Sequence, residues 1–401
     1  ATKDGYTVMP GGLARVSVRS DPRGHWHEPG DFSKDTWVKG SRATGVPAVV
    51  VPPHHTLQLR RGGRDLPSRK ADNLFWLGRY AERAEGAIRL LRSLFSRMSG
   101  EADLGDDPQT LQRLVSLLVM QEHLSPRRAK RAVAGGGDAV EAELRTILFD
   151  PDSPDGLAKI LQNVRRTAEL VRHRLSLDTW NILVELSNIP KEWGQTKGQS
   201  IDDALRVLSR MIQHLAALNG MVMENMTRSY AWRFLEMGRR LERVRHLSKL
   251  MRHLVTRGTP ETTGALNLLL ELADGSITYR TRYKAEAKLA AVLDLLLADD
   301  TNPRSVIFQL LTIEAHISAL PREENSASLP PAQQITTRIC ADIRLADMIR
   351  LTEFRKKSQV RANLDHLLIQ LDQGVHQLSD IVAHTYFSHS LAQRISGPQW
   401  L

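Results

Sequence analysis

The feature that most constrains the fold of this chain is a six-residue pattern that occurs twice. Gly-Arg-x-x-Glu-Arg begins at Gly78 and again at Gly238, and both copies lie in stretches whose apolar residues recur every three to four positions. That spacing predicts two amphipathic helices. In both copies the glycine and the glutamate fall at the same helical phase, beside the main apolar stripe. Each helix is therefore predicted to be buried on two sides, and the repeat indicates a duplicated helical unit.

The same pattern predicts how the two helices meet. Glycine carries no side chain that would hold a neighbouring backbone away. A carboxylate buried at such a contact needs an arginine, because an unpaired buried charge costs about 3–5 kcal/mol. The two copies supply matching partners, Glu82 with Arg243 and Glu242 with Arg83. The motif residues that we expect to form structural ion pairs are Arg79, Glu82, Arg83, Arg239, Glu242 and Arg243.

Two functional interpretations of the motif stay open beside this structural one. Its arginines could form a ligand or partner site, or its two glutamates could act as an acid and base pair. Flanking arginines lower the pKa of a carboxyl group, which makes a glutamate a poor general acid near neutral pH. No residue is therefore assigned as catalytic.

The two ends of the chain differ in composition. From Ala71 onward helical periodicity dominates, so the predicted fold class is mainly all-α, a duplicated multi-helix bundle over residues 71–401 with halves of about 71–222 and 223–401. Residues 1–51 hold short β-type runs among many glycines and prolines, and residues 52–70 have the composition of a linker. Two or three strands cannot close a core alone. The first segment is therefore predicted to be either the end of a larger sheet-containing domain or a segment docked on the helices.

A second cluster of possible functional residues lies in the stretch "DGSITYRTRYKAE". It consists of Tyr279, Arg280, Arg282 and Tyr283. Such a cluster could hold an anion or stack on a ring, or it could simply connect two helices.

Charge and cysteine content limit the classes of partner. The net charge is +10, but basic residues alternate with acidic ones along every predicted helix. Such mixing is typical of a solvated surface, so we do not expect nucleic-acid binding. The histidines lack zinc spacing, and no metal site is expected. A single cysteine fits a reducing compartment, and no apolar run is long enough to span a membrane. A cytoplasmic location is expected.

Several stretches resemble one known family. "SRKADNLFWLGRYAERAEGAIRLL", "RFLEMGRRLERV", "DGSITYRTRY", "NPRSVIFQL" and "HTYFSH" are similar to the alpha-E family of bacterial helical domains. The resemblance runs over about residues 71–390. It implies a helical domain in which the Glu-Arg pair recurs.

The beginning of the chain resembles a different family. "VMPGGLARV" and "SKDTWV" are similar to the C-terminal end of circularly permuted ATP-grasp domains, which resemble amide ligases that activate a carboxylate as an acyl phosphate. The resemblance implies that residues 1–51 are the remnant of a truncated ATP-grasp domain. In an intact ligase Arg15 and Lys34 are candidate phosphate contacts because of their charge, although Lys34 could equally be a surface residue. An intact protein of this kind would use ATP and Mg²⁺, whereas no cofactor is expected for this chain alone.

Together these observations give one leading functional hypothesis. The helical domain is expected to be an accessory module of an ATP-dependent carboxylate–amine ligase, with the ATP-grasp domain as its fused or separate partner. It would position a peptide or protein substrate without catalysing a reaction itself. The first alternative is a helical enzyme with an acid/base or anion site lined by Glu82, Glu242 and the Tyr/Arg cluster. The second alternative is a binder of anionic polymers.

Overall fold

The computed structural model divides the chain into two units, Ala1–Arg61 and Gly62–Leu401. It describes residues 11–16, 32–37, 66–100, 109–194, 200–257, 263–321 and 328–387. In the first unit β1 (Gly11–Val16) pairs antiparallel with β2 (Phe32–Trp37). The register places Arg15 opposite Ser33 and Lys34 opposite Ala14. The other β-type runs expected before residue 52 lie outside the described residues.

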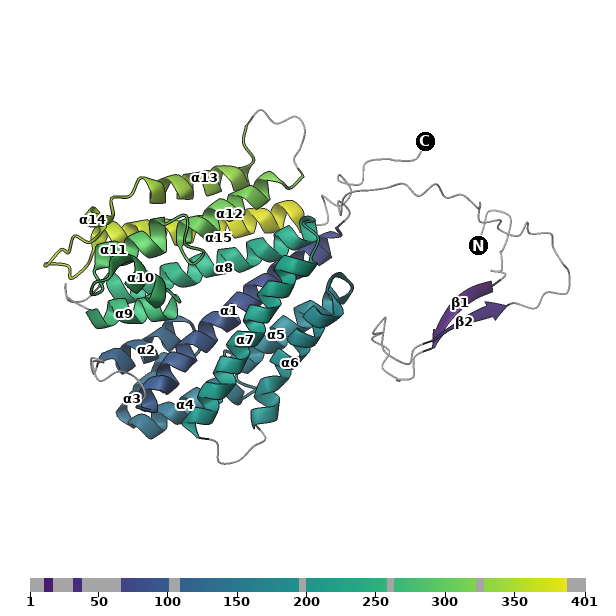
Figure 1. The fold of residues 1–401 in the computed structure, drawn as a ribbon, viewed down its shortest axis with the longest axis horizontal. Helices are drawn as coiled ribbons and strands as arrows, with labels where there is room; N and C mark the ends of the chain where they lie inside the picture. The colour runs from purple at the N-terminus through teal and green to yellow at the C-terminus, as the bar shows by residue number, and fades with distance from the viewer. Residues whose placement is uncertain are drawn as a thin grey trace. The chain divides into compact units, whose positions relative to one another are not determined.

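The second unit is helical in all of its regular elements that the structure describes (Figure 1). Its first half contains α1 (Ser68–Met98), α2 (Gln109–Met120), α3 (Pro126–Ala134), α4 (Gly137–Phe149), α5 (Leu157–Leu170), the short 3-10 turn η1 (Arg172–Arg174), α6 (Leu177–Gly194) and α7 (Ile201–Asn225). Its second half contains α8 (Tyr230–Val255), α9 (Thr263–Leu272), α10 (Ser276–Tyr283), α11 (Leu289–Leu293) with the π-helical turn η2 (Asp294–Ala298), α12 (Val306–Ser318), α13 (Pro331–Arg344), α14 (Met348–Leu351) and α15 (Ala362–Tyr386). The predicted mainly all-α class is confirmed.

The two halves pack their helices in the same order. Helix α1 contacts α5 and α7, and α8 makes the corresponding contacts with α12 and α15. In the same way α6 packs on α5 and α7, while α13 packs on α12 and α15. Figure 1 shows α1 and α8 side by side in the middle, with α5 to α7 below them and α12, α13 and α15 above. The second unit is therefore a duplicated bundle that is joined along α1 and α8.

The apolar stripe of α1 explains why this helix lies at the centre. Its residues at three-four spacing are all buried, and they are Leu74, Leu77, Ala81, Ala84, Ile88, Leu91 and Phe95. The helix begins at Ser68, three residues before the predicted start of the helical domain at Ala71, and Pro67 stands at its N-cap. Proline is well suited to a helix start, because its fixed φ matches the helix and it has no N–H to leave unpaired.

The glycines of the repeated motif form the closest contact between the two halves. A Cβ added to Gly78 would lie 2.1 Å from the carbonyl oxygen of Leu235, and one added to Gly238 would lie 2.0 Å from that of Phe75. Each glycine thus touches the residue three positions before the other glycine, which makes the contact reciprocal. No side chain fits there, so the predicted close approach of the helix backbones is present.

Candidate functional site

The charged residues of the repeated motif form an ion-pair seam between α1 and α8. Arg243 donates from Nε and Nη2 to the two carboxylate oxygens of Glu82, at 2.5 and 2.8 Å. Arg83 Nε donates to Oε1 of Glu242 at 2.6 Å. These are the two pairings that the sequence repeat predicts. Both glutamates are buried, at 8% and 7% exposure, so the pairs compensate charges that water does not reach.

The seam departs from the symmetry of the repeat at its first arginine. Arg79 crosses to α8 and donates to Oε2 of Glu242 at 2.7 Å, and it also reaches Ser379 Oγ at 3.0 Å. Its counterpart Arg239 instead pairs within its own helix with Glu236, at 2.9 Å. Glu236 is fully buried and also binds Arg240. One glutamate of the seam is therefore held by two arginines from α1, and the other by one from α8.

The pKa of Glu242 reflects this double pairing. Burial alone raises the pKa of a carboxyl group, but the charges and hydrogen bonds of Arg79 and Arg83 outweigh it and lower the pKa to about 2. Glu242 is therefore ionised at neutral pH and cannot donate a proton there. This supports a structural role for it rather than an acid role.

A small pocket on one side of the seam is filled by the protein's own side chains. We call it the closed pocket; its volume is about 30 Å³ and its walls include Glu82, Gly86 and Arg243. Glu85 Oε1 accepts from Arg89 Nη2 at 2.9 Å and from Arg304 Nη1 at 2.8 Å.

The same two arginines line this pocket and bind a second carboxylate. Each also donates to Asp274 Oδ2 at 2.9 Å. The charges of Arg89 and Arg304, together with that of Arg243, lower the pKa of Glu85 to about 2 although burial raises it. The four charged groups thus neutralise one another and leave little space.

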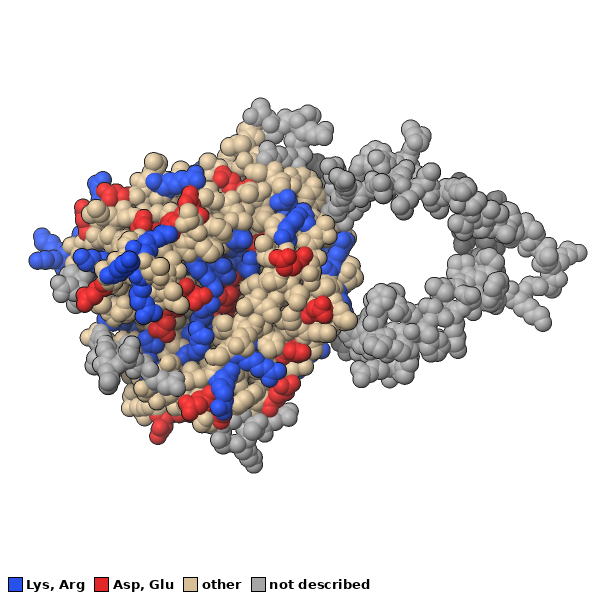
Figure 2. All heavy atoms as spheres, viewed as in Figure 1, with Lys and Arg blue, Asp and Glu red and all other residues tan. Residues whose placement is uncertain are grey.

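A larger pocket lies on the other side of the seam, and it is the candidate functional site. We call it the open pocket, and its volume is about 370 Å³, within the range of small-molecule sites. It is lined from α1 and α8, from the start of α5 and from the turn after α2; the lining residues are Tyr80, Arg83, Gln121, Glu122, His123, Pro154, Asp155, Lys159, Ile160, Asn163, Glu242, Arg245, His246 and Lys249. Figure 2 shows basic and acidic side chains gathered between the two groups of helices on the face that it draws.

The open pocket mixes cations, anions and neutral imidazoles. His123 Nδ1 lies 2.8 Å from the carbonyl oxygen of Asp155, so this nitrogen carries the proton and Nε2 is left as an acceptor. His246 fits because its neighbour Gly86 lacks a side chain; a Cβ there would lie 2.7 Å from the ring. Burial lowers the pKa of His246 to about 4. Both rings are neutral at pH 7, since burial also lowers the pKa of His123.

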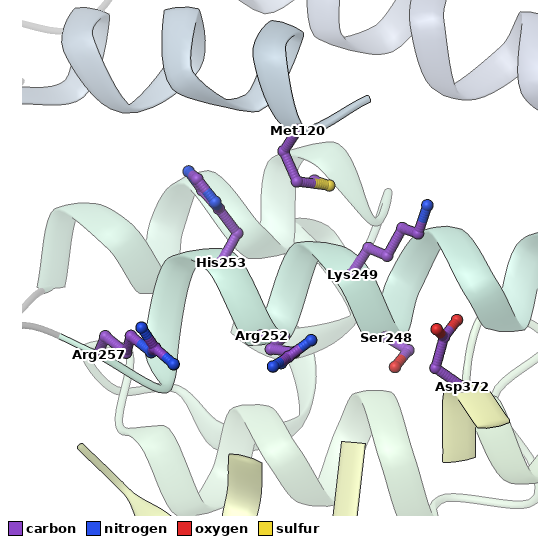
Figure 3. Close-up of a pocket in the computed structure, with 7 residues that line it drawn as sticks. All are labelled: Met120, Ser248, Lys249, Arg252, His253, Arg257 and Asp372. Carbon is purple, nitrogen blue, oxygen red and sulfur yellow. The ribbon is translucent and has the colours of Figure 1, made fainter. Parts of the chain in front are cut away.

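A third pocket continues along α8 and shares Lys249 with the open pocket. Its volume is about 470 Å³ (Figure 3). Figure 3 shows Lys249 and His253 extending toward α2, which carries Met120, while Arg252 lies on the side of α15. Arg252 donates to Asp365 at 2.9 Å. Lys249 therefore stands between two cavities, with no ion pair to any residue that the structure describes.

The Tyr/Arg cluster expected beside the glutamates is elsewhere. None of its four residues lines the open or the closed pocket. Tyr279 is buried and accepts from the backbone of Lys288, and Tyr283 donates to Asp294 at 2.7 Å. Arg282 pairs with Asp299, and Arg280 Nε donates to the carbonyl oxygen of Ser276 at 3.4 Å. The cluster connects α10 to the turns around it, so the expectation that it shares a groove with Glu82 and Glu242 is wrong.

The match to known proteins agrees with this seam. A family model described as a predicted α-helical domain with a conserved ER motif matches residues 66–387. The chain belongs to the Alpha-E family. In this chain Glu82–Arg83 and Glu242–Arg243 are two such Glu-Arg pairs, and they form the contact between the halves of the Alpha-E domain.

The relatives of the domain are longer proteins. An uncharacterized protein of Mycobacterium tuberculosis and one of Mycobacterium bovis are each 25% identical to this chain over 399 residues. The match covers 96% of this chain and 44% of each relative. No solved structure matches this chain.

No helix among the described residues combines the length and apolar character needed to cross a membrane. No group of three or more His, Cys, Asp or Glu side chains among them could hold a metal ion. Arg15 and Lys34 remain predictions, because the structure describes only the backbone at these positions.

Sequence reasoning identified the seam but missed the pockets beside it. Glu85 and Arg304 are 219 positions apart, and no local pattern links them. A signal was available in the internal repeat. Aligning "SPD" with "NPR" on Pro154 and Pro303 places Asp155 opposite Arg304, so the charge at this position differs in sign between the halves.

The neutral state of His246 predicts a pH effect on stability. Its pKa is about 4 in the folded chain, against its usual 6.5. The stability that this ring contributes is therefore fully present above pH 6.5 and is lost as the pH falls toward 4. We expect the free energy of unfolding in urea to decrease over this interval, with a share on the order of 3 kcal/mol from His246. The decrease should be smaller by this amount in His246→Asn; an unchanged slope would contradict the assignment.

Proposed function

We propose that this Alpha-E domain is a substrate-positioning module of an ATP-dependent carboxylate–amine ligase system, with the open pocket as its binding site. The observation that carries the proposal is the state of the charges in that pocket. Glu242 is held by two arginines with its pKa near 2, whereas Lys159 and Lys249 have no ion pair within the described structure. The pocket thus offers charges for binding, while Glu242 is held ionised and cannot act as an acid near neutral pH.

The ligase part of the proposal is supported from outside the helical unit. The stretches around Arg15 and Lys34 resemble the end of a circularly permuted ATP-grasp domain, and they form two paired strands. The chain spans less than half the length of the relatives that it matches, which leaves room in those proteins for another domain. In an intact protein the ATP-grasp domain would hold ATP and Mg²⁺ and form the acyl phosphate. The helical domain would then present the peptide or protein that reacts.

The two alternatives have less support. An acid/base enzyme needs groups that change protonation near neutral pH, and the pKa of Glu242 is far below that range. A binder of anionic polymers needs a surface of one sign, whereas Glu122 and Asp155 lie among the bases of the open pocket.

The proposal is tested on a full-length protein that contains the ATP-grasp domain. Lys249→Gln removes a charge that the pocket uses only for binding, so we expect KM for the peptide substrate to rise about tenfold with little change in kcat. The matched control is Lys191→Gln, because Lys191 is exposed on α6 and does not line the pocket. ATP–Mg should not bind to the 401-residue chain alone in calorimetry. Tight ATP binding by this chain, or an unchanged KM in Lys249→Gln, would contradict the proposal.

A further inference from the structure

We infer that the open pocket binds a small zwitterionic ligand, with a free carboxylate and a free ammonium group, of the size of an amino acid to a short peptide. The inference rests on the proposed function for the identity of the pocket as the substrate site. It adds the chemical class of the group that is recognised. Its basis is a comparison of the open pocket with the closed one.

The two pockets occupy equivalent places in the two halves. The motif glycines align Gly78 with Gly238, which places Glu85 opposite Arg245 and Arg89 opposite Lys249. The turns that border the pockets also correspond. Glu122 follows α2 and Asp274 follows α9 by the same two residues, and both have a left-handed backbone, with φ of 66° and 58°.

The charges that fill the closed pocket are reversed in the open one. In the closed pocket an anion from α1, Glu85, pairs directly with a cation at the start of α12, Arg304, at 2.8 Å. In the open pocket α8 supplies the cation Arg245, and the start of α5 supplies the anion Asp155. Among the described residues these two form no ion pair with each other; Arg245 instead lies 3.8 Å from Asp372 Oδ1 and 3.9 Å from Glu242 Oε2. The direct pair that fills the closed pocket therefore has no counterpart in the open one.

The open pocket is lined by charges of both signs, and these restrict the kind of ligand that it can bind. A ligand carboxylate would meet Lys249 and Lys159, with which it would form charge-assisted hydrogen bonds. A ligand ammonium would meet Asp155 and Glu122, which line the pocket and act on the His123 ring electrostatically, but whose side chains form no ion pair that the structure describes. A simple anion would gain the first set of contacts but would be repelled by the second. A zwitterion satisfies both.

An unpaired amide points to the same kind of ligand. The Nε2 atom of Gln121 is buried and has no hydrogen-bond partner, and Gln121 lines the open pocket. A buried donor without a partner costs about 1–3 kcal/mol. If the Gln121 side chain turned toward the pocket, a ligand carboxylate oxygen would accept from this atom.

The test is calorimetric titration of the 401-residue chain with four forms of trialanine. They are the free peptide, the N-acetylated peptide, the C-terminal amide and the doubly blocked peptide. We expect the free peptide to bind and each single block to weaken binding about tenfold or more. We expect Asp155→Asn to lose the discrimination against the N-acetylated form, and Lys249→Gln to lose that against the amide. A purely structural role for either residue would not produce this selective loss.

Matched controls separate charge recognition from general effects. Asp342→Asn and Lys191→Gln remove exposed charges on α13 and α6 that do not line the pocket, and both should discriminate as the parent does. Equal binding of all four peptides, or no binding of any, would overturn the zwitterion inference. The proposed function would still stand if Lys249→Gln raised KM for the peptide in the full-length protein. Both the proposed function and the zwitterion inference would be disproved only if Lys249→Gln also left that KM unchanged.

Discussion

Replacing Gly238 by alanine is expected to destabilise the Alpha-E domain by roughly 3 kcal/mol, although alanine is the better helix former. The added methyl group would lie 2.0 Å from the carbonyl oxygen of Phe75. That atom belongs to the backbone of α1, so no side-chain rotation can relieve the overlap. The two helices must move apart, and the seam of ion pairs between them must lengthen. Chemical denaturation followed by circular dichroism would measure the loss.

A second glycine provides the matched control. Gly220 is exposed in α7, five residues before that helix ends at Asn225, and nothing lies within 4 Å of a Cβ added there. Gly220→Ala should therefore stabilise the chain by about 0.5–1 kcal/mol through helix propensity alone. The two substitutions make the same chemical change with opposite expected signs. If Gly238→Ala were as stable as Gly220→Ala, the close contact of α1 and α8 would be disproved.

The fold could be predicted from the sequence because apolar residues recur at helical spacing and the Gly-Arg-x-x-Glu-Arg motif occurs twice. The stripe from Leu74 to Phe95 specifies which face of α1 is buried. The two copies of the motif specify that this helix meets α8. Small local errors remain, such as the start of α1 at Ser68, since residues near a helix end carry no periodic signal. These errors do not change the architecture.

The candidate site could be predicted only in part, because the turn after α2 and the residues around the start of α5 also line it, and no sequence pattern places them beside α1 and α8. The pairing of Glu82 with Arg243 follows from symmetry. The position of Tyr279 does not, and the expectation that it borders the glutamates fails because its hydroxyl is used at 3.1 and 3.0 Å by the backbone of residues 286 and 288. The open pocket arises where the halves differ, as at Asp155 and Arg304. The seam is formed by residues that the two halves have in common, so the repeat predicts it. The open pocket is formed by residues that differ between the halves, so the repeat does not predict it.

The largest electrostatic effect is expected for Glu242→Gln. This change leaves Arg79 buried at 5% exposure without its anion, while Arg83 is partly exposed and can turn toward water. Breaking a buried pair on one side costs about 3–5 kcal/mol, so we expect a loss of this size in the free energy of unfolding. Glu169→Gln is the control, because Glu169 pairs with Arg165 on an exposed turn of α5. Its loss should be below about 0.5 kcal/mol.

The pH dependence of this difference separates a charge effect from a packing effect. The pKa of Glu242 falls from 4.5 to about 2 on folding. A carboxyl group with a lowered folded pKa stabilises the fold above its unfolded pKa, and this contribution is lost as the pH falls through the folded value. The gap between the parent chain and Glu242→Gln should therefore be largest above pH 5 and should narrow toward pH 2. A gap that stayed constant across this range would mean that glutamine disturbs packing, and the ion pairs would then not be what holds α1 to α8. Adding Arg79→Met to Glu242→Gln should restore part of the loss, because the double variant no longer buries an unpaired guanidinium at the seam.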